Sequence, residues 1–104
     1  MTKVKLLMNW DIKDGRDQAY FEFMMRDWLP GVNKLGVQNM WAWYTVYCRE
    51  DDVPQIMAEA VVENLATMQA ILASDDWSNL HAQLLKYVDN YAHKVVRITG
   101  GFQL

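Results

Sequence analysis

Residues 37–50 read VQNMWAWYTVYCRE, and this stretch decides the fold that the sequence predicts. Aromatic and β-branched residues occupy both odd and even positions, which favours a long strand covered on both faces. A short acidic connection leads to residues 55–63, QIMAEAVVE, where side chains alternate with the period of a strand. Because the connection is short, we expect these two strands to pair as an antiparallel hairpin.

The chain before this hairpin predicts a strand and a helix. Residues 4–12, VKLLMNWDI, alternate with a two-residue period, and the even positions are all apolar. Apolar residues at helical spacing predict a helix over residues 16–29, with an apolar surface wide enough to be buried on more than one side. Pro30 and Gly31 predict that this helix breaks or kinks where they follow it.

The chain after the hairpin predicts two helical sections and a last strand. Asn64 and Ser74 are residue types that cap helix N-termini, so we expect a helix after each of them. We expect the apolar stripe of the second helix to run on through residue 91, with His93 near the helix end. The stripe comprises Trp77, Leu80, His81, Leu84, Leu85, Val88 and Tyr91. A short strand is predicted over residues 94–99.

The predicted order is strand, helix, strand, strand, helix, strand. This order is that of the ferredoxin-like α+β fold, a βαββαβ plait in which two helices cover one face of a four-stranded antiparallel sheet. With 104 residues, the chain has the length of one domain, and we take residues 1–104 as that domain.

The other face of the sheet has no helix to cover it. If the even positions of the first strand face the helices, we expect the uncovered face to carry Leu7, Asn9, Trp41, Trp43, Thr45, Tyr47, Met57, Glu59, Val61, Val95, Arg97 and Thr99. An apolar area of this size usually marks an interface, and two-fold symmetry is the commonest assembly of soluble chains. We therefore predict a homodimer whose interface includes Trp41, Trp43, Tyr47 and Met57.

Three polar residues fall on the same predicted face. Glu59 and Arg97 lie in the strands on either side of the strand that holds Asn9, and a buried charge is costly unless it is paired. We expect a network of Asn9, Glu59 and Arg97 across the sheet, which either fixes the dimer alignment or binds a polar ligand.

Composition excludes several classes of protein. The net charge is −3 and the basic residues are scattered, so nucleic acid is not expected as a partner. Cys48 is the single cysteine, which points to a reducing compartment and leaves no cysteine–histidine metal pattern. No signal peptide and no apolar run of membrane-spanning length is recognised, so we expect a cytoplasmic protein that does not enter a membrane.

Three features of the sequence resemble the dimeric α+β barrel superfamily. They are the Asn9-Trp10 pair in the first strand, the aromatic second strand and the run Ser74-Asp-Asp-Trp77. This superfamily includes stress-responsive barrel proteins, NIPSNAP-type and EthD-like proteins and antibiotic-biosynthesis monooxygenases. The resemblance implies a homodimer whose two sheets form a barrel, and a cleft between sheet and helices that some members use for haem or for aromatic substrates.

The candidate site residues are predicted partly from the position of side chains in the expected fold and partly from this resemblance. An imidazole at position 81 between helix and sheet could accept a proton or ligate haem iron, or it could be a structural histidine. Branches of the superfamily use asparagine, tryptophan or histidine in their clefts, which makes Asn9 and His81 candidate catalytic residues. We expect the ligand-binding residues of the cleft to be Trp10, Tyr44, Trp77 and His81.

Three functions remain open from the sequence. The first is a protein that binds a small apolar or aromatic molecule in the cleft between helices and sheet, without a required cofactor. The second is a cofactor-independent monooxygenase or related enzyme that acts on such a molecule, with His81 as proton acceptor. The third is a dimeric scaffold without a ligand, for which the layer between helices and sheet would be fully packed.

Overall fold

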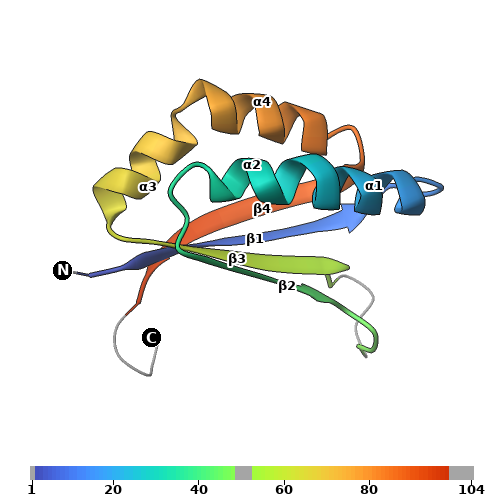
Figure 1. Cartoon of the computed structure of the whole chain (residues 1–104). Coiled ribbons are helices and arrows are strands. Elements are labelled where there is room, and N and C mark those ends of the chain that lie inside the picture. The colour runs from blue at the N-terminus through green and yellow to red at the C-terminus, as the bar shows by residue number, and fades with distance from the viewer. Residues whose placement is uncertain (1, 49–52, 99–104) are drawn as a thin grey trace.

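The computed structural model describes residues 2–48 and 53–98, which form a four-stranded antiparallel sheet in the order β2-β3-β1-β4. The helices all lie on one face of this sheet, and the other face is uncovered (Figure 1). This arrangement confirms the predicted ferredoxin-like α+β fold. In chain order the elements are β1 (Val4–Ile12), α1 (Asp17–Phe23), the π-helix η1 (Met24–Trp28), α2 (Leu29–Asn33), β2 (Asn39–Tyr44), β3 (Ile56–Val62), α3 (Leu65–Leu72), α4 (Asp75–Leu84) and β4 (Val88–Arg97).

The core lies between the helices and the central strands of the sheet. In β1 the even positions are buried, as the alternation predicts, and they pair across the sheet with the even positions of β3. The alanines of β3 at positions 58 and 60 are buried opposite Met8 and Leu6. Small side chains in β3 leave room for the large aromatic residues of α1 and η1, among them Trp28, which is 1% exposed.

The predicted helix does not end before Pro30. It continues through α1, η1 and α2, and the backbone N–H of Leu29 donates to the carbonyl oxygen of Met24, five residues earlier. Proline has no N–H, and its ring clashes with the carbonyl four residues before it in a regular α-helix. The wider π turn directly before Pro30 accommodates the proline within a continuous helix, so the predicted break is wrong.

The helix caps predicted in the second half of the chain are confirmed. The Asn64 side chain accepts a hydrogen bond from the backbone N–H of Thr67 at 2.8 Å. The Ser74 hydroxyl accepts one from the backbone N–H of Trp77 at 3.2 Å. Both contacts satisfy amides that a helix N-terminus leaves without a partner.

The predicted length of the last helix is wrong. Helix α4 ends at Leu84, and Val88, Tyr91 and His93 belong to strand β4. The backbone N–H of Tyr87 bonds the carbonyl of Leu84, which tightens the helix end into a turn and reverses the chain. Apolar residues happen to continue at helical spacing beyond this turn, which is why the sequence pattern extends the helix too far.

Strand β2 is shorter than predicted and lies at the edge of the sheet. Only residues 39–44 form the strand, although the backbone N–H of Thr45 still reaches the carbonyl of Gln55 at 2.8 Å. The single chain therefore leaves β2 largely exposed instead of covered on both faces. Tyr47, a predicted interface residue, lies beyond the strand and is 79% exposed. Arg49 and Glu50, at the end of the predicted strand, are outside the described residues.

The predicted face of the last strand is also wrong. Val95 pairs with Leu6 and Arg97 pairs with Val4, and paired residues of antiparallel strands share a face, so both lie on the helix side. The uncovered side of β4 carries Ala92, Lys94 and Val96, the partners of odd-numbered β1 residues. Thr99 is outside the described residues.

The expected Asn9–Glu59–Arg97 network therefore does not form. Arg97 is on the opposite face from the other two residues, because of the register of β4 against β1. Glu59 instead makes an ion pair with Lys5, with 2.9 Å between Oε1 and Nζ, and both side chains are less than one-fifth exposed. The pair satisfies the Glu59 carboxylate in the middle of the uncovered face.

In the part of the chain that the structure describes, no helix has the length and apolar character needed to cross a membrane.

Candidate functional site

An apolar hollow lies between the edge strand β2 and the helical segments α1 and η1. Its volume is about 230 Å³, and its wall is almost entirely apolar. The hollow is lined by Trp10, Tyr20, Phe21, Met24, Met25, Trp28, Leu29, Met40, Ala42, Trp43, Tyr44, Ile56 and Ala58. Concave sites of this kind, with few polar groups among aromatic side chains, are typical of small-molecule binding.

The π-helix places several of these side chains. In η1 the wider turn carries Met24, Met25 and Trp28 toward the same hollow, although Met24 and Trp28 are buried while Met25 is 70% exposed at its rim. Single π turns within longer helices occur often at functional sites. Methionine walls adapt to irregular ligands, because the thioether side chain is flexible and polarisable.

Tyrosine and tryptophan are the lining residues that carry an oxygen or nitrogen atom in the side chain. The hydroxyl of Tyr20 accepts a hydrogen bond from Trp10 Nε1 at 3.0 Å, and both residues are buried. Burial raises the pKa of the Tyr20 phenol to about 12, although the hydrogen bond from Trp10 acts in the opposite direction. The Trp28 indole Nε1 is buried and has no hydrogen-bond partner among the described residues.

An aromatic cluster fills the layer on the other side of Trp10. The ring of Tyr91 stacks on Trp10 with centroids 5.8 Å apart, and His81 meets Tyr91 edge-on at 4.4 Å. Trp77, one helical turn before His81, stacks parallel to the imidazole at 5.8 Å. This half of the layer is packed with rings, in contrast to the hollow beside β2.

Burial shifts the pKa of two members of this cluster, His81 and Tyr91. Its Nδ1 is buried and lacks a hydrogen-bond partner among the described residues. Burial lowers the pKa of the His81 imidazole, and the electrostatic interaction with the neighbouring His93 lowers it further. Burial also raises the pKa of Tyr91, whose hydroxyl lies 2.9 Å from His93 Nδ1.

The predicted ligand-binding residues are thus divided between two places. Trp10 and Tyr44 line the hollow, whereas Trp77 and His81 belong to the aromatic cluster behind Trp10. His81 lines neither this hollow nor the polar hollow at the end of β1. Asn9, the other candidate catalytic residue, faces the uncovered side of the sheet, opposite Met57.

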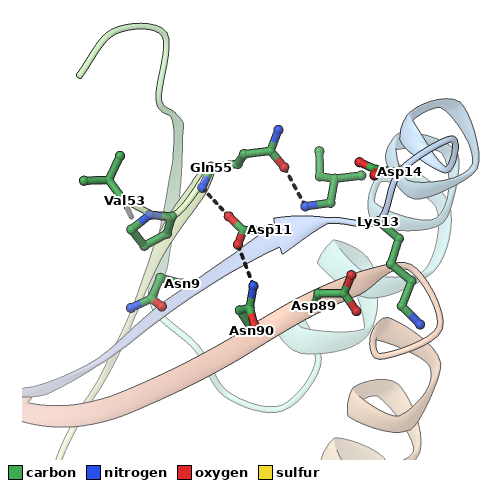
Figure 2. A pocket seen from close by; sticks show the side chains of 10 residues that line it. Asn9, Asp11, Lys13, Asp14, Val53, Gln55, Asp89 and Asn90 are labelled. Carbon is green, nitrogen blue, oxygen red and sulfur yellow. Dashed lines mark hydrogen bonds between the residues drawn. The ribbon is translucent and has the colours of Figure 1, made fainter. Parts of the chain in front are cut away.

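Asn9 lines a separate polar hollow at the end of β1, with a volume of about 830 Å³ (Figure 2). The Asp11 carboxylate organises this region, because it accepts hydrogen bonds from the Gln55 backbone N–H at 2.9 Å and from Asn90 Nδ2 at 2.9 Å. The Gln55 side chain in turn accepts from the Ile12 backbone N–H at 2.7 Å. These three bonds, dashed in Figure 2, connect β1 to β4 and to the residue that precedes β3.

Tyr20, Met24 and Trp28 line the hollow on the helix side but are not among the ligand-binding residues predicted from the sequence. Their helical spacing predicts only a wide apolar stripe. The available signal was the excess of apolar surface in residues 16–29 over what a two-layer fold can bury.

Several predicted interface residues do lie on the uncovered face. Trp41 pairs with Glu59 and Trp43 with Met57, which places all four on the face that has no helices. In the single chain Trp41 and Trp43 are each 51% exposed, and Met57 is 49% exposed. The exposed apolar area that the sequence predicts is therefore present.

Comparisons with known proteins identify the fold. No family model matches the sequence, and no curated protein is similar to it. Among solved structures, a hydroxynitrile lyase from Passiflora edulis has a TM-score of 0.79 at 10% identity, covering 96% of each chain. An EthD family protein from Bacillus halodurans has a TM-score of 0.74 at 15% identity, covering 95% of this chain and 100% of that one.

A third similar structure is a mutant of SnoaB, a cofactor-independent oxygenase from Streptomyces nogalater. Its TM-score is 0.66 at 14% identity, covering 98% of this chain and 96% of the oxygenase. Other similar structures are described as dimeric proteins of unknown function with a ferredoxin-like fold. The chain therefore has the same ferredoxin-like fold as these structures.

Proposed function

We propose that this protein binds a small apolar molecule, of the size of one or two aromatic rings, in the hollow between β2 and the α1–η1 segment. The observation that carries the proposal is the hollow itself, an apolar space of about 230 Å³ whose wall includes a π-helical turn. A scaffold without a ligand would have a fully packed layer between helices and sheet. Here the α4 side of the layer is packed, and the β2 side is open.

Binding is favoured over catalysis by the chemistry of the wall. The described residues that line the hollow include no histidine, aspartate or glutamate, the usual proton acceptors. His81 is separated from the hollow by Tyr91 and Trp10, which stack on each other. Similarity to a lyase and an oxygenase supports the fold only, since their identities to this chain are 10% and 14%.

The same proposal includes a two-fold dimer formed through the uncovered face of the sheet. Its support is the exposure of the large apolar side chains of β2 and β3, and the dimeric state of similar structures. The β2 residues Met40, Ala42 and Tyr44 line the hollow from the helix side of the sheet, while Trp43, on the uncovered face, also borders it at this edge strand. The dimer would therefore leave the hollow on the helix side of each sheet, with Trp43 at both the hollow and the interface.

Filling the hollow tests the proposed binding. Ala42 lies in β2 and lines the hollow, so Ala42→Phe should occupy the ligand space and weaken binding of tetralin by more than about tenfold. Isothermal titration calorimetry would measure the affinity. The matched control is Ala66→Phe, an exposed alanine in α3 that should leave the affinity unchanged. Unchanged binding in Ala42→Phe would place the ligand elsewhere.

A further inference from the structure

The Tyr20 hydroxyl has a hydrogen-bonding role that the folded chain uses only in part. An indole N–H can only donate, so in the contact with Trp10 at 3.0 Å the tyrosine oxygen must be the acceptor. The hydroxyl hydrogen of Tyr20 remains available, and the described residues provide no acceptor for it. A donor left unused in a buried position costs free energy until a partner arrives.

The unused donor belongs to a residue that lines the apolar hollow, where a ligand can supply the acceptor. Tyr20 lines the apolar hollow and is only 3% exposed. Trp28, another lining residue, is 1% exposed, and its indole Nε1 has no hydrogen-bond partner among the described residues. The other described lining residues with a polar side-chain atom other than sulfur are Trp10, Trp43 and Tyr44, and each of these carries a hydrogen-bond donor.

We propose that Tyr20 determines specificity in this hollow by donating its hydroxyl hydrogen to the carbonyl oxygen of a neutral, apolar ligand. The inference rests on the proposed function, because it requires that the hollow binds a ligand. A ketone or aldehyde brings an acceptor and no donor, which matches a wall in which donors are unpaired. An ion is disfavoured, because the described lining includes no charged side chain to pair with it.

The protonation state of Tyr20 is consistent with this role. Since burial raises its pKa to about 12, the phenol keeps its hydrogen throughout the physiological range. The hydrogen bond from Trp10 also fixes the hydroxyl in place, so that less freedom is lost when a ligand binds.

A matched pair of ligands tests the proposal. Tetralin and α-tetralone differ by one carbonyl group, and calorimetry would give the affinity of each for the full chain. In the wild-type protein the ketone should bind about fivefold more tightly than the hydrocarbon, the effect of one hydrogen bond. In Tyr20→Phe this preference, taken as the ratio of the two affinities measured on the same variant, should fall to within about twofold. A cooperative urea unfolding transition would show that the variant is folded.

The control variant is Tyr87→Phe, which removes a hydroxyl from a residue that stacks on Phe23 and does not line the hollow. It should keep the preference for the ketone. A second measurement needs no variant: the carbonyl stretching band of bound α-tetralone should lie at lower frequency than in a hydrocarbon solvent.

The outcomes separate this inference from the function on which it rests. If both ligands bind equally well to the wild-type protein, or if Tyr20→Phe keeps the preference, the role of Tyr20 is refuted and the binding function stands. An unshifted carbonyl band refutes it as well. If neither ligand binds, the proposed function fails and this inference fails with it.

Discussion

His81 is held by aromatic rings on two sides, stacked on Trp77 and edge-on to Tyr91. Its buried Nδ1 has no hydrogen-bond partner among the described residues. Burial and the electrostatic interaction with His93 both lower the pKa of His81, so they favour the neutral imidazole in the folded protein. Protonation of His81 therefore favours the unfolded chain, in which its pKa returns to 6.5.

The lowered pKa of His81 predicts that the free energy of unfolding depends on pH, and that substitution of His81 reduces this dependence. The contribution of His81 is fully present above its ordinary pKa, and it is lost as the pH falls through 6.5 toward the lowered value. In His81→Phe, which keeps a ring beside Trp77, the free energy of unfolding should fall less between about pH 7.5 and pH 5. Urea unfolding at a series of pH values would measure both curves, and parallel curves would contradict the prediction.

Individual residues were the hardest part of the site to predict from the sequence. Trp10 and Tyr44 were expected to bind the ligand, and they do line the hollow. Tyr20 and Trp28 were missed because period alone cannot separate a side chain that fills the core from one that borders a space. His81 contacts rings from both helix α4 and strand β4, as expected for a residue between helix and sheet. Its neighbours Tyr91 and His93, however, lie in strand β4, where the sequence pattern predicts a helix.

At the scale of elements, local hydrogen bonds decide where helices begin. The Ser74 hydroxyl accepts from the Trp77 backbone N–H at 3.2 Å, and it also donates to the Ile71 carbonyl at 2.6 Å. It therefore connects the end of α3 to the start of α4. Two aspartates in the first turn of α4 add favourable charge at the positive end of the helix dipole.

Removal of this cap should destabilise the protein by a measurable amount. Ser74→Ala leaves the first amides of α4 without their side-chain acceptor, and the expected loss is about 1 kcal/mol of unfolding free energy. Ser78→Ala is the matched control, because Ser78 lies inside the same helix and is exposed. Thermal and urea unfolding would compare the two variants, and equal stabilities would show that the cap contributes nothing.

The sequence predicted elements well where their ends carry a chemical signal, as at Asn64 and Ser74. It failed where the outcome depends on distant parts of the chain. Val88 starts a strand because β1 offers it a partner, Ile12, and this pairing has no local signature. The π turn before Pro30 is not predicted either. A proline predicts that a regular helix is disrupted, but it does not predict that a π turn replaces the regular turn.

At the scale of the whole molecule, the uncovered sheet face carries the proposed dimer interface. Trp41, Trp43 and Met57 are each about half exposed there, around the ion pair of Lys5 and Glu59. A second copy related by a two-fold axis would bury these side chains against their own counterparts.

One charge placed on this face should therefore separate the proposed dimer. Met57→Lys would bury an unpaired ammonium group at the interface, which should raise the dimer dissociation constant on the order of 100-fold. Leu65→Lys is the matched control, since Leu65 is 45% exposed in α3 and the helices lie on the other side of the sheet. Light scattering coupled to gel filtration would give the masses. A wild-type mass of one chain, or an unchanged mass in Met57→Lys, would contradict the dimer.

The place of β2 at the margin of the sheet has a kinetic consequence. Its hydrogen bonds within the sheet run to β3 alone, while β1 and β3 each have neighbours on both sides. Marginal strands fray at lower free energy than central ones, because fewer bonds are lost. For the proposed ligand, fraying of the six residues of β2 would provide a route in or out beside Ala42, without any opening of the central strands.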